Sequence, residues 1–320
     1  MSRYARQIAV PDVGAAGQAR IRAASVLVVG AGGLGSPVLQ YLAGAGVGRI
    51  TVVDGDVVDE TNLHRQPIFR MADIGAPKAA AAARAVTDLN PEVLAEARAA
   101  WLDPETAPQL VAGSDVVLDC ADSFAASFTL SDACHRAARP LISAAVLGLE
   151  GYAGGFCGGA PSVRAVFPDL PLTAPSCATA GVLGPVVGML GALQAQMALS
   201  VLLGLSPSPL GRLMRIDGRT WRLSGFTFTD APEPQTCWPF LAPSQIRADD
   251  LVIDLRTEVP APFRPGALQL PYEALADWLP PEHAGRVVLA CRTGLRAFAG
   301  AQLLSRSWHG PLALVGLPQR

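Results

Sequence analysis

Apolar residues in the first half of the chain follow two alternating patterns. Short runs rich in β-branched residues at 25–30 and 49–54 predict buried strands, and helical spacing of apolar residues over 34–45 predicts a helix between them. The alternation continues with a helix, a strand, a helix and a strand, over residues 78–90, 115–119, 128–139 and 140–145. Strands that alternate with helices in this way predict an α/β fold whose mostly parallel sheet is covered by helices on both faces.

The pattern changes after residue 150. Glycine and proline are frequent over residues 151–176, which predicts a long irregular segment, either a functional loop or a disordered one. Residues 178–205 then form the longest apolar run, which is long enough to raise the question of a membrane span. Because Gln194, Gln196 and several glycines and prolines interrupt this run, we expect a buried helix over 181–205 and no membrane.

A second proline-rich run, at residues 229–244, predicts a boundary between two domains. Beyond it, residues 251–255 and 286–290 have the pattern of buried strands, and residues 297–305 that of a helix. The length of 320 residues also exceeds that of one average domain. We therefore expect a first domain, a linker and a small α/β domain, at residues 1–235, 236–244 and 245–320.

Composition excludes several classes of partner. With 27 acidic and 25 basic residues, the formal net charge is -2, and no basic tail or patch indicates nucleic acid or a membrane surface. The first residues lack the apolar core of a signal peptide, so we expect a cytoplasmic protein. The six cysteines have no framework spacing, which favours free thiols over disulfides in that compartment.

Glycines at the end of the first predicted strand form a phosphate-binding pattern. Gly30, Gly32, Gly33 and Gly35 stand in a G-x-G-x-x-G segment between a strand and a helix, where backbone N–H groups and a helix N-terminus can bind phosphate. Asp54 ends the next strand, where a carboxylate can bind ribose hydroxyls, as in a Rossmann-like fold. An NAD-dependent oxidoreductase has the same two features, and the glycines can also serve helix–strand packing alone, so all three interpretations stay open.

A polar cluster after this position favours a nucleoside triphosphate. Asp56, Asn62, Arg65 and Gln66 follow closely, and Lys78, the only lysine of the chain, begins the next predicted helix. A dehydrogenase has no evident need for this set. A nucleotidyltransferase does, because cationic side chains must offset the phosphate charge while pyrophosphate leaves.

Four motifs in order resemble the adenylating enzymes of the MoeB/ThiF family, which are related to ubiquitin-activating enzymes. They are the N-terminal segment 3–8, the glycine loop, the cluster at 62–66 and Lys78, and the resemblance covers about residues 3–205. It implies a homodimer that binds ATP at the glycine loop, with Arg6 reaching the nucleotide of the partner subunit. It also implies that the substrate is a ubiquitin-like sulfur-carrier protein with a C-terminal Gly-Gly.

Asp122 is the candidate magnesium ligand. Residues 119–123 follow a predicted strand and resemble the magnesium-site motif of the family, and a carboxylate is a suitable ligand for Mg²⁺ beside phosphate. The alternative role of Asp122 is a helix N-cap. Two residues depart from the family pattern, Ser123 in place of the usual Asn and Ser127 in place of an arginine.

Cys177 lies in a segment that resembles the reactive-cysteine loop of these enzymes. There a thiolate can attack an acyl-adenylate or relay sulfur, although a lone cysteine also serves as a small apolar filler. Relatives often bind zinc through two C-x-x-C pairs. Here Ser162 and Ala165 occupy the first pair's positions and only Cys237 remains of the second, so we expect no zinc.

Cys291 heads a second candidate reactive loop, residues 291–296, between a predicted strand and a helix. Backbone amides, arginines and a helix N-terminus in such a loop are expected to lower the pKa of the thiol. The loop resembles the active site of rhodaneses, and residues 251–256 and 265–267 resemble other landmarks of that family. Because the domain is short, an inactive structural remnant is the alternative.

The combined expectation is an ATP- and Mg²⁺-dependent adenylyltransferase. It would activate the C-terminal glycine carboxylate of a ThiS- or MoaD-type carrier, and sulfur from Cys291, with Cys177 as the relay, would give a thiocarboxylate for thiamin or molybdopterin biosynthesis. The candidate catalytic residues are Arg65, Lys78, Asp122, Cys177 and Cys291. An NAD-dependent oxidoreductase and a non-catalytic carrier-binding scaffold are the alternatives, and a cysteine desulfurase as sulfur donor and tRNA thiolation as the pathway stay open.

Overall fold

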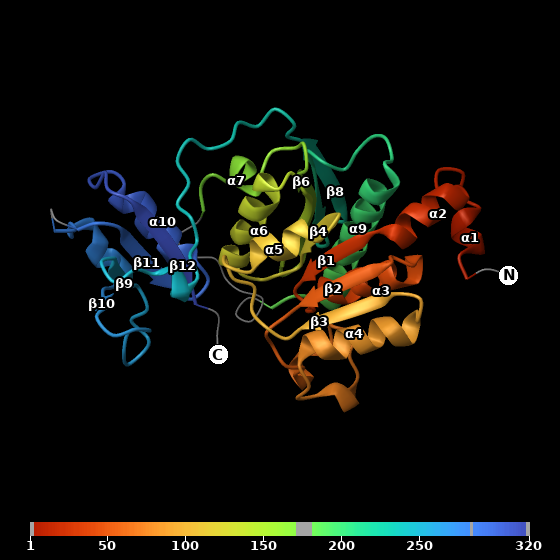
Figure 1. Ribbon diagram of the computed structural model, residues 1–320, viewed down its shortest axis with the longest axis horizontal. Helices are drawn as coiled ribbons and strands as arrows, with labels where there is room; N and C mark the ends of the chain where they lie inside the picture. The colour runs from red at the N-terminus through yellow and green to blue at the C-terminus, as the bar shows by residue number, and fades with distance from the viewer. Residues whose placement is uncertain (1–2, 171–180, 282–283, 318–320) are drawn as a thin grey trace.

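The computed structural model describes residues 3–170, 181–281 and 284–317, which form two β-sheets with their covering helices. The larger sheet has eight strands in the order β3-β2-β1-β4-β5-β6-β7-β8, and the smaller has four in the order β10-β9-β11-β12. Figure 1 shows the two sheets side by side along the long axis of the molecule.

Five strands form the parallel half of the larger sheet. They are β1 (Ser25–Val29), β2 (Arg49–Val53), β3 (Leu94–Arg98), β4 (Val116–Asp119) and β5 (Pro140–Leu147). β1 pairs with β2 and β4, β2 also pairs with β3, and β4 pairs with β5, all in parallel. With these four parallel pairings against three antiparallel ones, the expected Rossmann-like, mostly parallel α/β fold is confirmed.

Helices cover both faces of this sheet. One face carries α3 (Gly35–Ala45), α4 (Lys78–Leu89) and α9 (Gly184–Leu203), whose apolar residues join the strands in one buried cluster. The other carries α5 (Ala107–Ala112), α6 (Phe124–Arg136) and α7 (Val163–Val166), which belong to a second cluster. Two N-terminal helices, α1 (Ala5–Ile8) and α2 (Gly14–Ala23), lie at the end of the molecule far from the small sheet (Figure 1).

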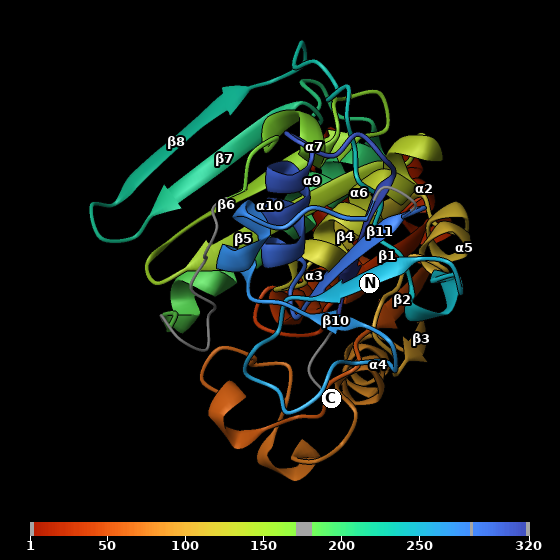
Figure 2. The ribbon, with the colours of Figure 1, turned by 90° about the vertical axis from the view of Figure 1, so that its left-hand side faces the viewer.

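Three antiparallel strands extend the sheet beyond β5. They are β6 (Glu150–Cys157), β7 (Arg212–Asp217) and β8 (Arg222–Thr227), and β8 is outermost (Figure 2). The expectation of an irregular segment over 151–176 was wrong for its first part, which forms β6. Glycine is required there by close packing, since a Cβ atom on Gly155 would lie 2.6 Å from the carbonyl oxygen of Pro209. Residues 171–180 lie outside the described residues.

The long apolar helix α9 is a core helix. Its length and apolarity alone would suffice to cross a membrane, but half of it is buried, against α3 and the sheet. The buried side chain of Gln194 donates to the carbonyl oxygens of Asp119 at 2.8 Å and Ile142 at 3.3 Å. The glutamine that interrupts the apolar run therefore ties the helix to the end of β4 and to the first half of β5.

The smaller sheet is parallel. Its strands are β9 (Leu251–Asp254), β10 (Leu268–Gln269), β11 (Val287–Cys291) and β12 (Leu312–Gly316), and α10 (Leu295–Leu304) packs on it. Short 3-10 helices η1 (Glu60–Asn62), η2 (Met71–Asp73), η3 (Pro243–Gln245) and η4 (Tyr272–Ala276) lie in the connections. The two strands and the helix that the sequence predicts in this region are present.

The two sheets are joined by a continuous hydrophobic contact. Phe128 of α6 stacks with Phe240 at a centroid distance of 6.5 Å and with Phe298 of α10 at 6.0 Å. These side chains are all buried, and burial of each contributes about 2 kcal/mol. The segment expected as a linker at 236–244 takes part, because Phe240 pairs with Leu314 of β12 and continues the small sheet.

Candidate functional site

The glycine loop between β1 and α3 is a tight turn with one open side. Gly30 has φ +94°, and a Cβ atom there would lie 2.5 Å from the carbonyl oxygen of Cys120. A Cβ atom on Gly35 would collide with the carbonyl oxygen of Gly30. At Gly32 the nearest atom to such a Cβ is Nε2 of Gln66, at 3.6 Å. Gly30 and Gly35 are therefore needed for the fold, whereas Gly32 has room beside it.

Two buried polar atoms at this loop lack a hydrogen-bond partner among the described residues. They are Oγ of Ser36, in the first turn of α3, and Oε1 of Gln66. Both side chains are almost fully buried, at 0% and 3% exposure. A buried unpartnered polar group is costly, and a bound phosphate or sugar would supply a partner. Together with the N-terminus of α3, they make the loop fit a nucleotide.

Asp54, the expected ribose ligand, braces the glycine loop. One carboxylate oxygen accepts the N–H of Ala31 at 2.7 Å and the other that of Asp56 at 2.8 Å. Burial raises the pKa of Asp54, and these two hydrogen bonds and the charge of Lys78 offset part of the rise. Each oxygen keeps a lone pair free for a ribose hydroxyl.

Lys78 and Asp56 form an ion pair at the start of α4. The ammonium group lies 2.9 Å from an Asp56 carboxylate oxygen, and the backbone N–H of Lys78 donates to the carbonyl oxygen of Asp56 at 2.8 Å. The lysine side chain is 7% exposed and that of Asp56 50%. The two residues are therefore brought together, with the cation held in place by the carboxylate.

The cluster at residues 62–66 lies beside the glycine loop. A Cβ atom on Gly33 would lie 3.6 Å from Cγ of Arg65. Gln66 donates to the side-chain oxygen of Asn62 at 3.3 Å. The guanidinium of Arg65 bonds the carbonyl oxygen of Thr61 at 3.2 Å and contacts the His64 ring at 2.9 Å, and it has no carboxylate partner among the described residues.

Asp122 is exposed, between β4 and α6, next to the glycine loop. Its alternative role as a helix N-cap is wrong, because α6 begins at Phe124, earlier than expected, and Ser123 is its N-cap. In the described part of the chain, Asp122 does not belong to a group of three or more carboxylates, histidines or thiols that could hold a metal. Its donor set therefore suits a Mg²⁺ ion that takes its other ligands from phosphate and water.

Asp119, three residues earlier, is fully buried instead. It accepts hydrogen bonds from Ser143 at 2.8 Å and from the N–H of Ala121 at 3.2 Å. Burial raises its pKa, and hydrogen bonds, first among them that of Ser127, counteract the rise. Ser127, noted as a departure from the family pattern, thus supports the loop that presents Asp122.

Arg6 lies far from this glycine loop. It belongs to α1, whose preceding residue Tyr4 is buried against Gly46 and accepts a hydrogen bond from Asn90 at 2.9 Å. Gly46 and Asn90 follow α3 and α4, at the opposite edge of the sheet from Gly30. The side chain is exposed, so any contact of Arg6 with a nucleotide has to be with that of another subunit.

Cys291 is buried at 2% exposure in the loop between β11 and α10. Its sulfur accepts the N–H of Ala297 at 3.3 Å. The expectation of a lowered thiol pKa was wrong: burial raises the pKa of Cys291 more than the surrounding backbone N–H groups lower it. Arg292 and Arg296 are paired with Glu258, at 3.9 and 3.3 Å. Cys177 lies outside the described residues.

The residues at the family's zinc positions do not fit a zinc ion. Ser162 donates its N–H and its hydroxyl to the carboxylate of Glu233, at 2.7 and 2.6 Å. Cys237 is exposed, and Phe240 is stacked on Phe128. In the described residues, no three groups of the kind that bind metals come together. Hydrogen bonds from Ser162 to Glu233, and from Arg164 to the carbonyl oxygen of Trp238 at 3.3 Å, connect the two segments that a metal would otherwise join.

Sequence analysis missed several residues of this region. Ser36 has a signal, because it is a polar residue that directly follows the glycine motif in an apolar helix. Glu233 carries none, since its role depends on a partner 71 residues away.

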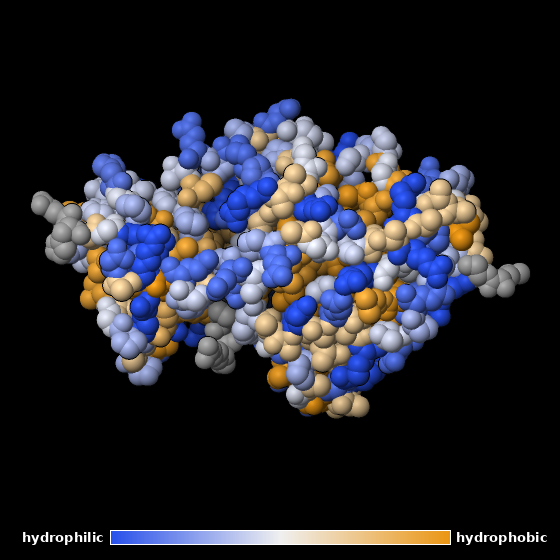
Figure 3. All heavy atoms as spheres, viewed as in Figure 1, coloured by the Kyte–Doolittle hydropathy of each residue, from blue (hydrophilic) through white to orange (hydrophobic). Residues whose placement is uncertain are grey.

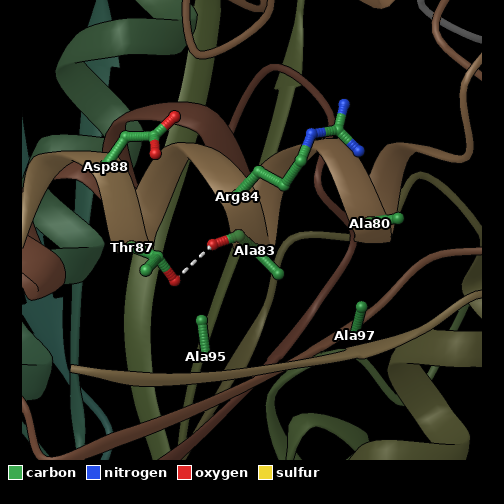
Figure 4. A pocket seen from close by; sticks show the side chains of 7 residues that line it. All are labelled: Ala80, Ala83, Arg84, Thr87, Asp88, Ala95 and Ala97. Atoms are coloured by element: carbon green, nitrogen blue, oxygen red, sulfur yellow. Dashed lines mark hydrogen bonds between the residues drawn. The ribbon is translucent and has the colours of Figure 1, made fainter. Parts of the chain in front are cut away.

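A shallow cavity lies elsewhere, between α4 and the edge strand β3 (Figure 4). Its volume is about 380 Å³, and alanines line it together with Arg84, Thr87 and Asp88. Thr87 is already bonded to the carbonyl oxygen of Ala83 at 3.1 Å, as Figure 4 shows. None of the glycine-loop residues lines this cavity, and it lacks converging polar groups, so the glycine loop is the better candidate site.

Known proteins resemble the first domain. The model of the ThiF family matches residues 4–238. The SAMP-activating enzyme E1 of Haloferax volcanii is 41% identical over 239 residues, which are 74% of this chain and 88% of that protein. Adenylyltransferase and sulfurtransferase MOCS3 of Bos taurus is 49% identical over 218 residues, 67% of this chain and 48% of that protein. The chain thus matches about half the length of the latter.

Solved structures show the same fold. Escherichia coli MccB with MccA-N7isoASN has a TM-score of 0.66 at 23% identity, covering 74% of this chain and 75% of that one. MccB with ATP has a TM-score of 0.63 at 22% identity, with 74% of each chain covered. The family match extends over more than half of the chain and includes the glycine loop, Lys78 and Asp122. The chain therefore belongs to the ThiF family and is an adenylyltransferase.

Proposed function

We propose that this chain uses ATP and Mg²⁺ to adenylate the C-terminal carboxylate of a ubiquitin-like sulfur-carrier protein, and that Cys291 then supplies sulfur. The product is a carrier thiocarboxylate, for thiamin or molybdopterin biosynthesis. The observation that carries the proposal is the pair of unpartnered buried atoms, Ser36 Oγ and Gln66 Oε1, beside an open Gly32 at the N-terminus of α3.

The charged residues around the loop fit attack at the α-phosphorus. A carboxylate oxygen of the carrier attacks, pyrophosphate leaves, and Lys78 and Arg65 offset the charge of the leaving phosphates. Asp56 fixes the ammonium group of Lys78, so little side-chain entropy is lost when the nucleotide binds. Mg²⁺ held by Asp122 would neutralise further phosphate charge.

A second subunit completes the site in this proposal. Arg6 is exposed and lies at the opposite edge of the sheet from its own glycine loop. A homodimer that brings α1 of one subunit to the nucleotide of the other gives this arginine a phosphate to bind. The helix α1 is only four residues long and contains no acidic residue that would compete with a phosphate for Arg6.

The sulfur step follows from thiol chemistry. The terminal sulfur of a persulfide on Cys291 attacks the acyl carbon, and AMP leaves with the electron pair of the C–O bond. A second thiolate, for which Cys177 is the candidate, then attacks the Cys291 sulfur of the acyl disulfide. This releases the thiocarboxylate and leaves a Cys177–Cys291 disulfide, which an external dithiol reduces. The persulfide itself comes from a sulfur donor such as a cysteine desulfurase.

A protein substrate needs a surface beyond the nucleotide pocket. The outer strand β8 offers unpaired backbone groups, and Trp221, Leu223 and Phe226 at this edge are 85%, 69% and 53% exposed. By contrast, the face in Figure 3 mixes hydrophilic and hydrophobic residues over both sheets. Strand addition at β8 is the contact we expect for the carrier. Leu223→Arg should then raise the KM for carrier and leave ATP binding unchanged.

The test is carrier-dependent ATP–pyrophosphate exchange, with each ubiquitin-like carrier of the source genome tried in turn. Wild-type protein and Cys291→Ser should exchange at equal rates, because exchange needs adenylation alone. Asp122→Asn should lose at least about a hundredfold in rate, with the melting temperature unchanged because Asp122 is exposed. Carrier binding without any exchange would instead indicate a scaffold, and a rise in melting temperature with NADH but not with ATP would indicate an oxidoreductase.

A further inference from the structure

The Cys291 loop is hydrogen-bonded to the segment that presents Asp122. The carbonyl oxygen of Thr293, two residues after Cys291, accepts the backbone N–H of Ala125 at 3.0 Å. It also accepts the hydroxyl of Ser123 at 3.4 Å. Ser123 directly follows Asp122, so the candidate metal ligand and the candidate sulfur carrier stand on the two sides of one contact.

Small residues make this contact close. A Cβ atom on Gly294 would lie 2.7 Å from the Phe240 ring and 3.1 Å from the Ala125 methyl group. One on Gly316, at the end of β12, would collide with the same methyl group. The contact therefore has a defined fit, which side chains of ordinary size at these positions would destroy.

The carboxyl ends of both sheets meet here. β4 ends at Asp119, three residues before Asp122, and β11 and β12 end at Cys291 and Gly316. Figure 1 shows the small sheet and α10 next to α6, which begins at this edge of the large sheet. Ligands of open α/β sheets bind at the carboxyl ends of the strands, so the two candidate sites face a common interface.

The connection between the domains is hydrogen-bonded to both of them: Arg164 of the first domain donates to the carbonyl oxygen of Trp238 at 3.3 Å. The N–H of Leu241 donates to the carbonyl oxygen of Leu314 at 2.8 Å, and the N–H of Leu314 donates to that of Pro239 at 2.9 Å. Phe240 between them is buried at 6% exposure. Because residues 238–241 are bonded to both domains, they do not form a free linker on which the small domain could swing to another subunit.

The distances allow both steps at one place. From Asp122 to Cys291 the path runs through one peptide, the Ser123–Thr293 hydrogen bond and two further residues, which together span at most about 20 Å. An extended carrier tail of about six residues covers the same length.

We propose that the small domain is seated on the nucleotide domain of its own chain, so that Cys291 serves the adenylate formed in that chain and not the one in the partner subunit. This inference rests on the proposed function. It assigns Ala125, Ser123, Gly294 and Gly316 as positioning residues, which hold the Cys291 loop at the nucleotide site and do not touch the reacting atoms.

Chemical cross-linking tests the placement of the small domain on its own chain without an activity measurement. Gln302 of α10 donates to Asp169 at 2.6 Å across the domain boundary, and both side chains are at the surface. The variant combines Asp169→Cys and Gln302→Cys with Cys237→Ser. Unlabelled and ¹⁵N-labelled preparations of this variant are mixed and allowed to exchange subunits. The mixture is then treated with a short bismaleimide. The expected cross-linked peptides join residues 169 and 302 with the same isotope on both. Mixed-isotope pairs, or no cross-link, would overturn the inference.

Complementation tests the functional consequence. Asp122→Asn and Cys291→Ser chains with different tags are co-expressed, and heterodimers are isolated through both tags. Delivery within a chain predicts no thiocarboxylate, because neither chain has both sites. Delivery between chains would give about half the wild-type rate and would overturn the inference.

The two failures are distinguishable. If wild-type protein exchanges pyrophosphate but forms no thiocarboxylate, the sulfur step of the proposed function is wrong, and delivery by Cys291 falls with it. Mixed-isotope cross-links together with normal thiocarboxylate formation would refute only the placement of the small domain on its own chain. A heterodimer of wild-type and doubly substituted chains should give half the wild-type rate, which verifies that subunit pairing itself leaves the sites intact.

Discussion

The ammonium group of Lys78 lies 2.9 Å from a carboxylate oxygen of Asp56, with the lysine buried and the aspartate half-exposed. A buried cation beside an open glycine loop retains its attraction for phosphate, because little water screens it. The single lysine of the chain is thus positioned before any nucleotide binds.

Lys78→Met should reduce ATP–pyrophosphate exchange by about a hundredfold or more, because the charge on the leaving phosphates loses its cation. Arg84→Met, on the same helix, is the matched control, since Arg84 is paired with Asp73 at the surface and its loss should leave exchange unchanged. Equal rates in both variants would remove Lys78 from the site.

Gly32→Ala and Gly35→Ala separate binding from folding. At Gly32 a methyl group meets only Gln66, at 3.6 Å, so the melting temperature should stay unchanged. ATP binding should weaken by about tenfold or more, because the methyl group occupies the phosphate position. At Gly35 it collides with backbone, so the melting temperature should fall by several degrees. Calorimetry with and without ATP measures both, and unchanged ATP affinity in Gly32→Ala would contradict the phosphate assignment.

The sequence predicts most of the parallel half of the fold and the positions that form the candidate nucleotide site, because both depend on local patterns. Gly30, Gly32, Asp54 and Lys78 lie where strands and helices begin or end, and strand–helix alternation alone brings such positions to one edge of the sheet.

The antiparallel strands and the domain contact are not predictable in the same way. Gly151 and Gly155 lie in β6 because neighbouring backbone and side chains pack closely against them, a condition set by residues distant in the sequence. The raised pKa of Cys291 likewise follows from burial, whereas the amides and arginines visible in the sequence indicate the opposite shift.

Acid should destabilise the small domain through Asp250. This carboxylate is 1% exposed and lies 2.6 Å from Arg286. Burial alone would raise its pKa, but hydrogen bonds from Arg286 and from the N–H of Arg247 lower it below the usual value. The stabilisation is therefore fully present above the unfolded pKa of about 3.9 and is lost as pH falls through the lower, folded pKa.

Thermal unfolding from pH 7 to pH 2 measures this dependence. The melting temperature of the wild type should change little above about pH 5 and fall steeply below about pH 4. Asp250→Asn should cost about 2 kcal/mol at neutral pH and flatten the acid limb. An acid limb of wild-type steepness in this variant would assign the effect to other carboxylates.

Glu233 should matter more for stability than Cys237. Glu233→Ala leaves the N–H and hydroxyl of Ser162 without their acceptor and should cost about 1–3 kcal/mol. Cys237→Ser, at an exposed position, should change the free energy of unfolding by less than about 0.5 kcal/mol. A stoichiometric zinc signal in the purified protein, lost in Cys237→Ser, would contradict this assignment.

The stack of Phe240, Phe128 and Phe298 has a consequence for any attempt to cut the chain in two. The ring of Phe128 belongs to the first domain, and the two rings stacked on it belong to the chain beyond residue 235. Neither piece therefore keeps its aromatic residues buried when it is separated from the other. The whole chain should melt in one transition with equal calorimetric and van't Hoff enthalpies, and a fragment ending near residue 235 should expose aromatic surface and aggregate. Replacing the small domain with another one would thus have to begin by rebuilding the surface around Phe128.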